Sequence, residues 1–441
     1  MVIKKNLFIL LFFSFFSMQC SSVPTNIQPQ INGLVVAGKF RAAMETIADN
    51  QDAYGKNNRL LYDMDYGLIL QFAGEYEKSI EYFNRAKRAY DELLTVSLSQ
   101  EVSTWLVNDY LAPYRGEDFE RVMINIFQSL NFASLGLWEE ALVEARDVDI
   151  QLRLINSQYQ PNQKNVYQED AFARLLMGLL YEAQDTLEGY NDALISYRKA
   201  LTIYENDFAK NYGLGIPQIL KENILAVTQM LDLEEFKEYQ EKLGPVKYVS
   251  LEEKRQKAQV YLIHYDGLSP IKHQWSLPIP LPNGYVTQLA FPQYDKRNSE
   301  KKEKIFKAIS RANEETVSAV EKGQDIGAIA IKNLDNRRAR VIAKALLRSG
   351  AKYFLEQQGE SFLKRESGQT SARIFKYLSN LYNITSEQAD LRSWQTLPER
   401  IEIARLILDQ GEYDFFVNQK KIRHFSLGSG DVKFIIYRSA E

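Results

Sequence analysis

The chain has 441 residues, a hydrophobic fraction of 45% and a charged fraction of 25%, which excludes general disorder and leaves room for two or three domains. No apolar run of about 18 residues lies beyond the N-terminus, which excludes a polytopic membrane protein. The net charge of −3 gives no electrostatic sign of nucleic-acid binding, and none is expected. A single Cys excludes an internal disulfide and a Cys-based zinc site.

The N-terminus has the pattern of an export signal. Two lysines precede the apolar run 7–16, which is too short to span a membrane, and Cys20 follows it. The pattern resembles a bacterial lipoprotein signal, with residues 1–20 as the signal, lipidation at Cys20 and a polar linker over 21–30. Residues 17–19 depart from the usual residues before the Cys, which leaves an uncleaved anchor as the alternative. Ser21 after the Cys resembles outer-membrane sorting, so we expect an exported envelope lipoprotein facing the periplasm or the cell surface.

Residues 31–245 carry a recurring helical pattern. After a first helix and a turn, an aromatic residue is followed by small, polar or apolar residues three or four positions apart. This spacing puts them on one face of a helix, where a small residue lets the partner helix approach closely. The pattern resembles the tetratricopeptide repeat, although an unrelated helical bundle remains the alternative. The sequence has three copies and an opening partial copy. The first contains Gly67, Gly74, Tyr76, Ser79, Phe83 and Ala86, the second Gly136, Trp138, Ala141, Ala145 and Val148, the third Gly178, Tyr181, Tyr190, Ala193, Tyr197 and Ala200, and the partial copy Gly38, Phe40, Ala43 and Ile47.

The largest interruption of the repeats runs from 95 to about 119. Its Pro- and Gly-containing centre predicts a loop that leads into a helix, where the acids at 117, 118 and 120 favour the helix N-terminus. Tyr110, Tyr114 and Arg115 are residue types that anchor protein partners, so this loop is also a candidate binding rim.

A second, mixed domain is predicted over 246–441, which makes the fold class α+β. Strands are expected at 259–265, 305–310, 400–408, 412–417 and 432–439, with short edge strands such as 285–290 in a Pro-rich stretch. A long helix is expected from 325 to about 357. Trp394 is expected in the core, beside an Asp390–Arg392 polar network. The strands of this domain are expected to be short and antiparallel.

The long helix carries a basic stripe at intervals of four residues: Arg340, Lys344, Arg348 and Lys352. One interpretation is a docking face for an anion such as a phospholipid headgroup, a glycan phosphate or the acidic repeat domain. The other is a solvated helix face.

The two halves of the chain differ in charge. Residues 241–441 contain 33 Lys or Arg and 24 Asp or Glu, a net charge of +9, whereas residues 1–240 have a net charge of −12. This split predicts either an electrostatic interface between the domains or with a partner, or a chance difference between two solvated surfaces.

The sequence offers little for catalysis. It has no Cys outside the signal, no His pair at metal-ligand spacing and no phosphate-binding Gly-Lys-Ser/Thr motif. Each of the three His is expected to be structural, and a carboxylate pair for glycan cleavage stays open, because sequence gives no separation. We therefore expect no catalytic residue, no metal and no cofactor, and the protein is not expected to be an enzyme.

Five segments together resemble a family of uncharacterised bacterial lipoproteins with tetratricopeptide-like repeats. The segments are 63–74, 113–121, 260–270, 337–352 and 390–398. The resemblance carries no assigned reaction. With the repeats and the signal, it implies a membrane-anchored scaffold for an unidentified envelope protein. The alternatives are a regulatory partner of an envelope-biogenesis machine, such as a peptidoglycan synthase or an exporter, and a glycan-active enzyme.

Overall fold

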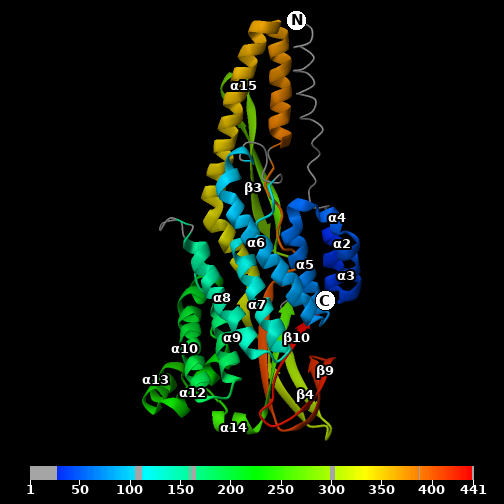
Figure 1. The fold of residues 1–441 in the computed structure, drawn as a ribbon. Coiled ribbons are helices and arrows are strands. Elements are labelled where there is room, and N and C mark those ends of the chain that lie inside the picture. Colours follow the sequence, from blue (N-terminus) through cyan, green and yellow to red (C-terminus); the bar gives the residue numbers. More distant parts are fainter. Residues whose placement is uncertain are drawn as a thin grey trace.

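The computed structural model describes residues 27–104, 112–157, 159, 165–297, 303–386 and 388–439. The fold is α+β, as expected, with helices in the first half of the chain and strands with one long helical element in the second. No helix in these ranges combines the length and apolarity needed to cross a membrane. Figure 1 shows a layered body from which a long arm extends.

The first half of the chain is helical. Consecutive helices pack in pairs, α5 with α6, α7 with α8, α9 with α10 and α12 with α13. Their bounds are α2 Ile27–Val36, α3 Phe40–Asp49, α4 Gln51–Tyr54, α5 Arg59–Phe72, α6 Tyr76–Thr104, α7 Asp118–Ser134, α8 Trp138–Ser157, α9 Ala171–Glu182, α10 Leu187–Ile203, α11 Ala209–Tyr212, α12 Gln218–Leu231, α13 Leu233–Leu243 and α14 Leu251–Gln256. The short 3-10 helix η1 covers Lys56–Asn58 and the π-helix η4 covers Tyr204–Phe208.

In two helix pairs a glycine allows the close approach that the pattern predicts. A Cβ placed on Gly67 would lie 3.0 Å from the Phe83 ring, and one on Gly178 would lie 2.1 Å from the Tyr197 ring. Each glycine therefore lets the second helix bring its aromatic ring against the backbone of the first. The expected close approach of two helices at a small residue is therefore confirmed for these two pairs.

The strands form two four-stranded sheets and one hairpin. The first sheet has the order β10-β1-β7-β6, with β1 parallel to β10 and antiparallel to β7, and the second has the order β5-β4-β8-β9. The bounds are β1 Ala258–Asp266, β2 Ile271–Pro280, β3 Val286–Asp295, β4 Ile305–Ser310, β5 Glu315–Ala319, β6 Glu321–Asp325, β7 Arg400–Leu408, β8 Gly411–Val417, β9 Lys420–Leu427 and β10 Val432–Arg438, and the 3-10 turn η5 Pro282–Gly284 joins β2 to β3.

The first sheet lies between the helices and the second sheet. On β1, Tyr261, Ile263 and Tyr265 belong to the core shared with the helices. Val260 and Leu262, which alternate with them, belong to the core shared with the second sheet. The hydrophobic core therefore continues across the Gly244–Pro245 break into both halves of the chain.

The arm consists of β2, β3 and α15 (Ile326–Ser386), which packs on β3. The expected single helix over 325–357 is wrong in extent. The helix continues to a break at Gly368, where φ is 86°, and a second helix then returns along the first. A Cβ on Gly359 would lie 2.9 Å from the Phe375 ring, so the two helices are closely packed. The β2–β3 hairpin has only edge strands, which accommodates its prolines.

Other expectations need smaller corrections. The first part of the interruption expected from 95 is helical, because α6 continues to Thr104. The expected helix N-terminus after it is confirmed, since α7 begins at Asp118 and the Glu117 N–H donates to Glu120 Oε2. Strands β5, β6 and β9 were not expected.

Candidate functional site

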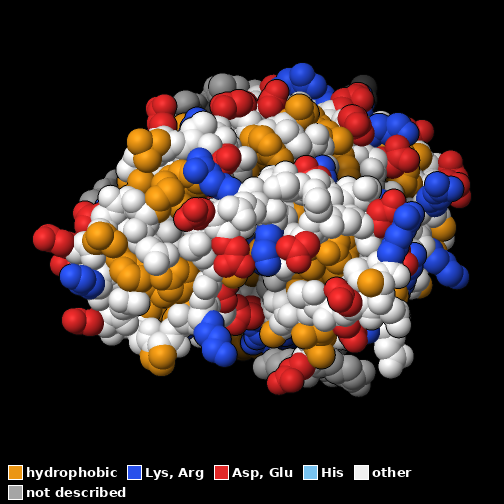
Figure 2. All heavy atoms as spheres, turned by 90° about the horizontal axis from the view of Figure 1, so that it is seen from below, with side chains coloured by type: hydrophobic (Ala, Val, Ile, Leu, Met, Phe, Trp, Pro, Cys, Tyr) orange, Lys and Arg blue, Asp and Glu red, His pale blue; other side chains and the backbone are white. Residues whose placement is uncertain are grey.

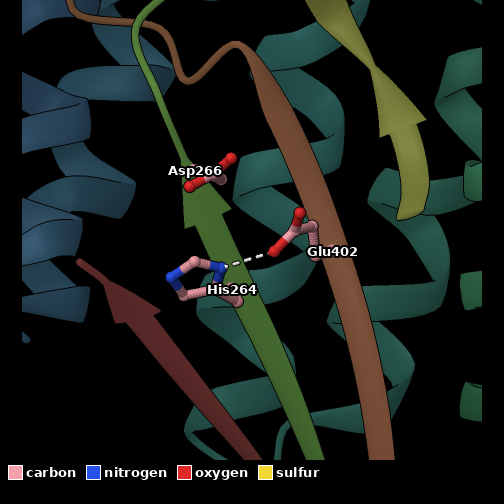
Figure 3. A group of neighbouring side chains, drawn as sticks. All are labelled: His264, Asp266 and Glu402. Carbon is pink, nitrogen blue, oxygen red and sulfur yellow. Dashed lines mark hydrogen bonds and ion pairs between the residues drawn. The ribbon is translucent and has the colours of Figure 1, made fainter. Parts of the chain in front are cut away.

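A buried group of ionisable side chains lies at one end of β1 and β7. His264 and Asp266 are two residues apart on β1, so their side chains lie on the same face, the one toward the second sheet. On β7, Glu402 is the residue paired directly with His264. Figure 3 shows the three side chains on the same side of these strands. Their ligand atoms lie within 4.8 Å of one another, which makes the group a candidate metal site.

Two cations already neutralise this group. Lys304 Nζ lies 2.9 Å from Asp266 Oδ1 and 3.3 Å from Glu402 Oε2, and Arg400 Nε donates to Asp266 Oδ2 at 3.0 Å. Burial alone would raise the pKa of Asp266, but hydrogen bonds from Lys304 and Arg400 bring it below its ordinary value.

The two carboxylates of Asp266 and Glu402 are already balanced in charge by Lys304 and Arg400. A divalent ion would add two positive charges to this neutral set, which disfavours its binding. His264 Nδ1 is also directed at Glu402 Oε2, at 2.9 Å. We therefore interpret the group as an ion-pair network that joins β1, β7 and the residue preceding β4.

The inner face of the helices is filled by the C-terminal half of the chain. The Trp394 ring packs edge-on to Phe83 and Phe127, at centroid distances of 6.1 and 5.7 Å. Tyr265 contacts Phe127 from β1, and its hydroxyl donates to Gln71 Oε1 at 2.8 Å. A surface that a helical repeat could offer to a partner is thus occupied within the same chain.

Two buried acids hold the Trp394 segment in place. The backbone N–H of Trp394 donates to Glu120 Oε1 at 2.7 Å, and the Thr396 hydroxyl donates to Asp65 Oδ1 at 2.7 Å. Burial raises the pKa of Glu120 to about 7 and that of Asp65 to about 6. The predicted core position of Trp394 is confirmed.

Basic residues of the C-terminal half form ion pairs with acidic residues of the N-terminal half where the two halves meet. Among the described residues, six ion pairs join a basic residue of 246–441 to an acid of 31–245, which confirms an electrostatic interface between the two halves. They are Lys254–Glu182 (2.8 Å), Arg405–Glu222 (2.6 Å), Arg255–Asp185 (2.6 Å), Arg337–Asp118 (4.0 Å), Lys272–Glu117 and Arg337–Glu117.

Of the loop residues predicted to bind a partner, the structure describes Tyr114 and Arg115. Tyr114 is only 3% exposed, and its hydroxyl donates to Glu120 Oε2. Its prediction as a surface anchor is therefore wrong, because the loop folds inward onto the Trp394 segment. Arg115 is exposed. Tyr110 and Cys20 lie outside the described residues.

The basic stripe of α15 can be judged at one position. Lys352 is 7% exposed, so at its end the stripe is not an open solvated face. The side chains of Arg340, Lys344 and Arg348 are not among those described.

The arm carries an exposed apolar surface that the sequence patterns did not reveal. Among the described residues, half of the twenty exposed large apolar side chains lie on the arm, including all four exposed aromatics. The end of the body opposite the arm instead mixes acidic and basic side chains with separate apolar patches (Figure 2). The ten arm residues are Ile271, Trp275, Leu277, Leu346, Leu347, Phe354, Leu355, Phe362, Ile374 and Tyr377.

The arm is also strongly basic. Residues 326–386 contain eleven Lys or Arg and four Asp or Glu, a net charge of +7. An exposed apolar surface within a field of one sign is typical of a site that binds another molecule. Comparison of the sequence with protein-family models and with curated proteins found no match.

Proposed function

We propose that the protein is a membrane-anchored, cell-envelope scaffold that binds a partner protein through its arm. The anchor is the lipid expected on Cys20, and the helical half, which resembles tetratricopeptide repeats, forms the base that carries the arm. The observation that carries the proposal is the concentration of exposed aromatic side chains on α15 and β2. Aromatic residues are enriched in the energetically important centres of protein interfaces.

The occupied inner face of the helices explains why the arm is favoured as the contact. A segment bound along α5 and α7 would have to displace Trp394 and Tyr265, which pack there against Phe127. The arm is available without any rearrangement. A regulatory partner of an envelope-biogenesis machine is the form of this function in which the C-terminal half makes the contact. No catalytic activity is part of the proposal.

The charge and shape of the arm define the kind of partner. A net charge of +7 on α15 favours a partner whose apolar patch has an acidic rim. The exposed apolar residues lie on β2 and on both helices of α15, and therefore on more than one element. This favours a protein with a complementary shape over a flat lipid surface.

The test is a crosslinked pull-down of the membrane-anchored protein and two matched triple variants. In the first, Phe354, Phe362 and Tyr377 on the arm are replaced by Ser. In the control, Leu187, Val143 and Ile195 on the helical half are replaced by Ser, and all six side chains are more than half exposed.

We expect one recurrent partner with the unchanged protein and the control, and at least a tenfold lower yield with the arm variant. Equal yields from both variants would contradict the proposal. Recovery of anionic lipid and no recurrent protein would contradict the proposal and would indicate that the arm binds the membrane surface.

A further inference from the structure

A separate cavity of about 200 Å³ lies where the first helices meet the last two strands. One wall is formed by the turns before α3 and α6, and includes Phe72 and Tyr76. The opposite wall is formed by β9 and β10. This cavity is distinct from the arm and from the ion-pair network.

The lining of the cavity is basic. It contains Lys420, Arg423 and Arg438, and no Asp or Glu is among its lining residues. Arg438 is 4% exposed and lies over the Phe72 ring. Within the described part of the chain, neither Lys420 nor Arg423 forms an ion pair, whereas the neighbouring Lys421 pairs with Asp414.

A bulge in β9 brings the two exposed cations to the cavity together. Lys420 and Arg423 are three residues apart, so a regular strand would direct them to opposite faces. The pairing with β8 shifts between Phe415 and Phe416, which places one additional residue on β9. Both cations consequently line the same cavity, and β-bulges commonly redirect side chains in this way.

The helix ends at the cavity reinforce its positive potential. Gly38 and Phe40 line it at the start of α3, and Gly74 and Tyr76 line it at the start of α6. Helix N-termini carry partial positive charge and N–H groups without an intrahelical partner. Phe72, Tyr76 and Tyr437 add aromatic surface beside these charges.

We propose that this cavity binds the phosphate group of a small organic phosphate, with Lys420 and Arg423 contacting the phosphate and the aromatic wall contacting its organic part. Three cations and two helix N-termini favour a group that can carry more than one negative charge over a neutral ligand. The phosphate can belong to a phospholipid headgroup or to a soluble phosphate ester, and a cavity of about 200 Å³ accommodates the headgroup-sized part of either.

The test uses the full chain in neutral detergent, titrated with glycerol 3-phosphate and, separately, with nanodiscs containing phosphatidylglycerol. Binding is measured by calorimetry and by the rise in melting temperature. The test variant carries Lys420→Ala and Arg423→Ala, both at exposed positions. The control is Lys433→Ala, on β10 but outside the cavity lining.

We expect saturable binding of at least one probe, weakened at least tenfold by the double substitution and unchanged by the control. Binding of glycerol 3-phosphate would indicate a soluble ester, and binding of the nanodiscs alone would indicate a lipid headgroup. No saturable binding of either probe, or equal binding by the double variant with an unchanged melting temperature, would overturn the proposal.

Discussion

Glu120 is the buried acid on which the fit between the two halves of the chain depends. It accepts hydrogen bonds from the backbone N–H groups of Trp394 and Glu117 and from the Tyr114 hydroxyl. Burial raises its pKa to about 7, against an unfolded value of about 4.3. Between these two pH values the folded chain holds a proton that the unfolded chain has lost. Stability therefore falls as pH rises, by up to about 1.4 kcal/mol per pH unit from this group.

The first prediction concerns this pH dependence. Glu120→Gln removes the titrating group, so we expect the decrease in melting temperature between pH 5 and pH 7.5 to be smaller in the variant than in the unchanged protein. Its overall melting temperature should also be lower, because one amide cannot replace all three accepted hydrogen bonds. The measurement is thermal unfolding followed by circular dichroism.

The control for Glu120 is Glu238→Gln, at an exposed position of α13. It should leave the pH dependence unchanged. An identical slope for Glu120→Gln and the unchanged protein would show that Glu120 takes up no proton on folding.

The helix pairs are held together by close approach at glycines. Gly178 on α9 has no space for a side chain, because a Cβ there would lie 2.1 Å from the Tyr197 ring of α10. We predict that Gly178→Ala lowers the free energy of unfolding by about 1–3 kcal/mol, since the helices must separate or the ring must leave its position. Urea unfolding measures this change.

Gly33 provides a control for the substitution at Gly178. Gly33 lies within α2, and a Cβ there would meet no atom within 4 Å. Gly33→Ala should therefore be neutral or stabilise the protein by up to about 1 kcal/mol, because Ala favours the helix. Equal effects of the two substitutions would contradict the packing described for α9 and α10.

Elements with a strong local pattern were predictable from the sequence. Strand β1 and strand β7 alternate or run apolar because both faces are buried, and their expected ranges are confirmed. Strand β9 was missed because most of its side chains are exposed at the edge of its sheet, which leaves no apolar alternation. The helix was expected to end at about 357, so the rest of α15, including the second helix after the break at Gly368, was missed.

The candidate sites depend on contacts between distant parts of the chain. Glu402 faces His264 only through the register of β7 with β1, which sequence alone does not give. Tyr114 was expected at the surface because its residue type suits an interface, but the loop packs onto a segment nearly 280 residues later. The cations of the cavity share a face only because of the bulge in β9.

At the scale of the whole molecule, the two halves form one unit. The core runs from α2 to Phe434 on β10, and ion pairs such as Lys254–Glu182 cross between the halves. Breaking a buried pair of this kind leaves an uncompensated charge, which is strongly unfavourable. The helical half therefore packs as one unit with the sheet that carries the arm, and in the proposed function the arm contacts the partner.

The central claim is that the arm, and not the inner face of the helices, contacts the partner. Its most direct test places a photoreactive amino acid at Tyr377 on the arm in one protein, and at Val143 on the exposed helical surface in another, in living cells. Mass spectrometry then identifies what each position captures. We predict one recurrent envelope protein from position 377 and none in common from position 143. Capture of the same protein from position 143 alone would contradict the claim.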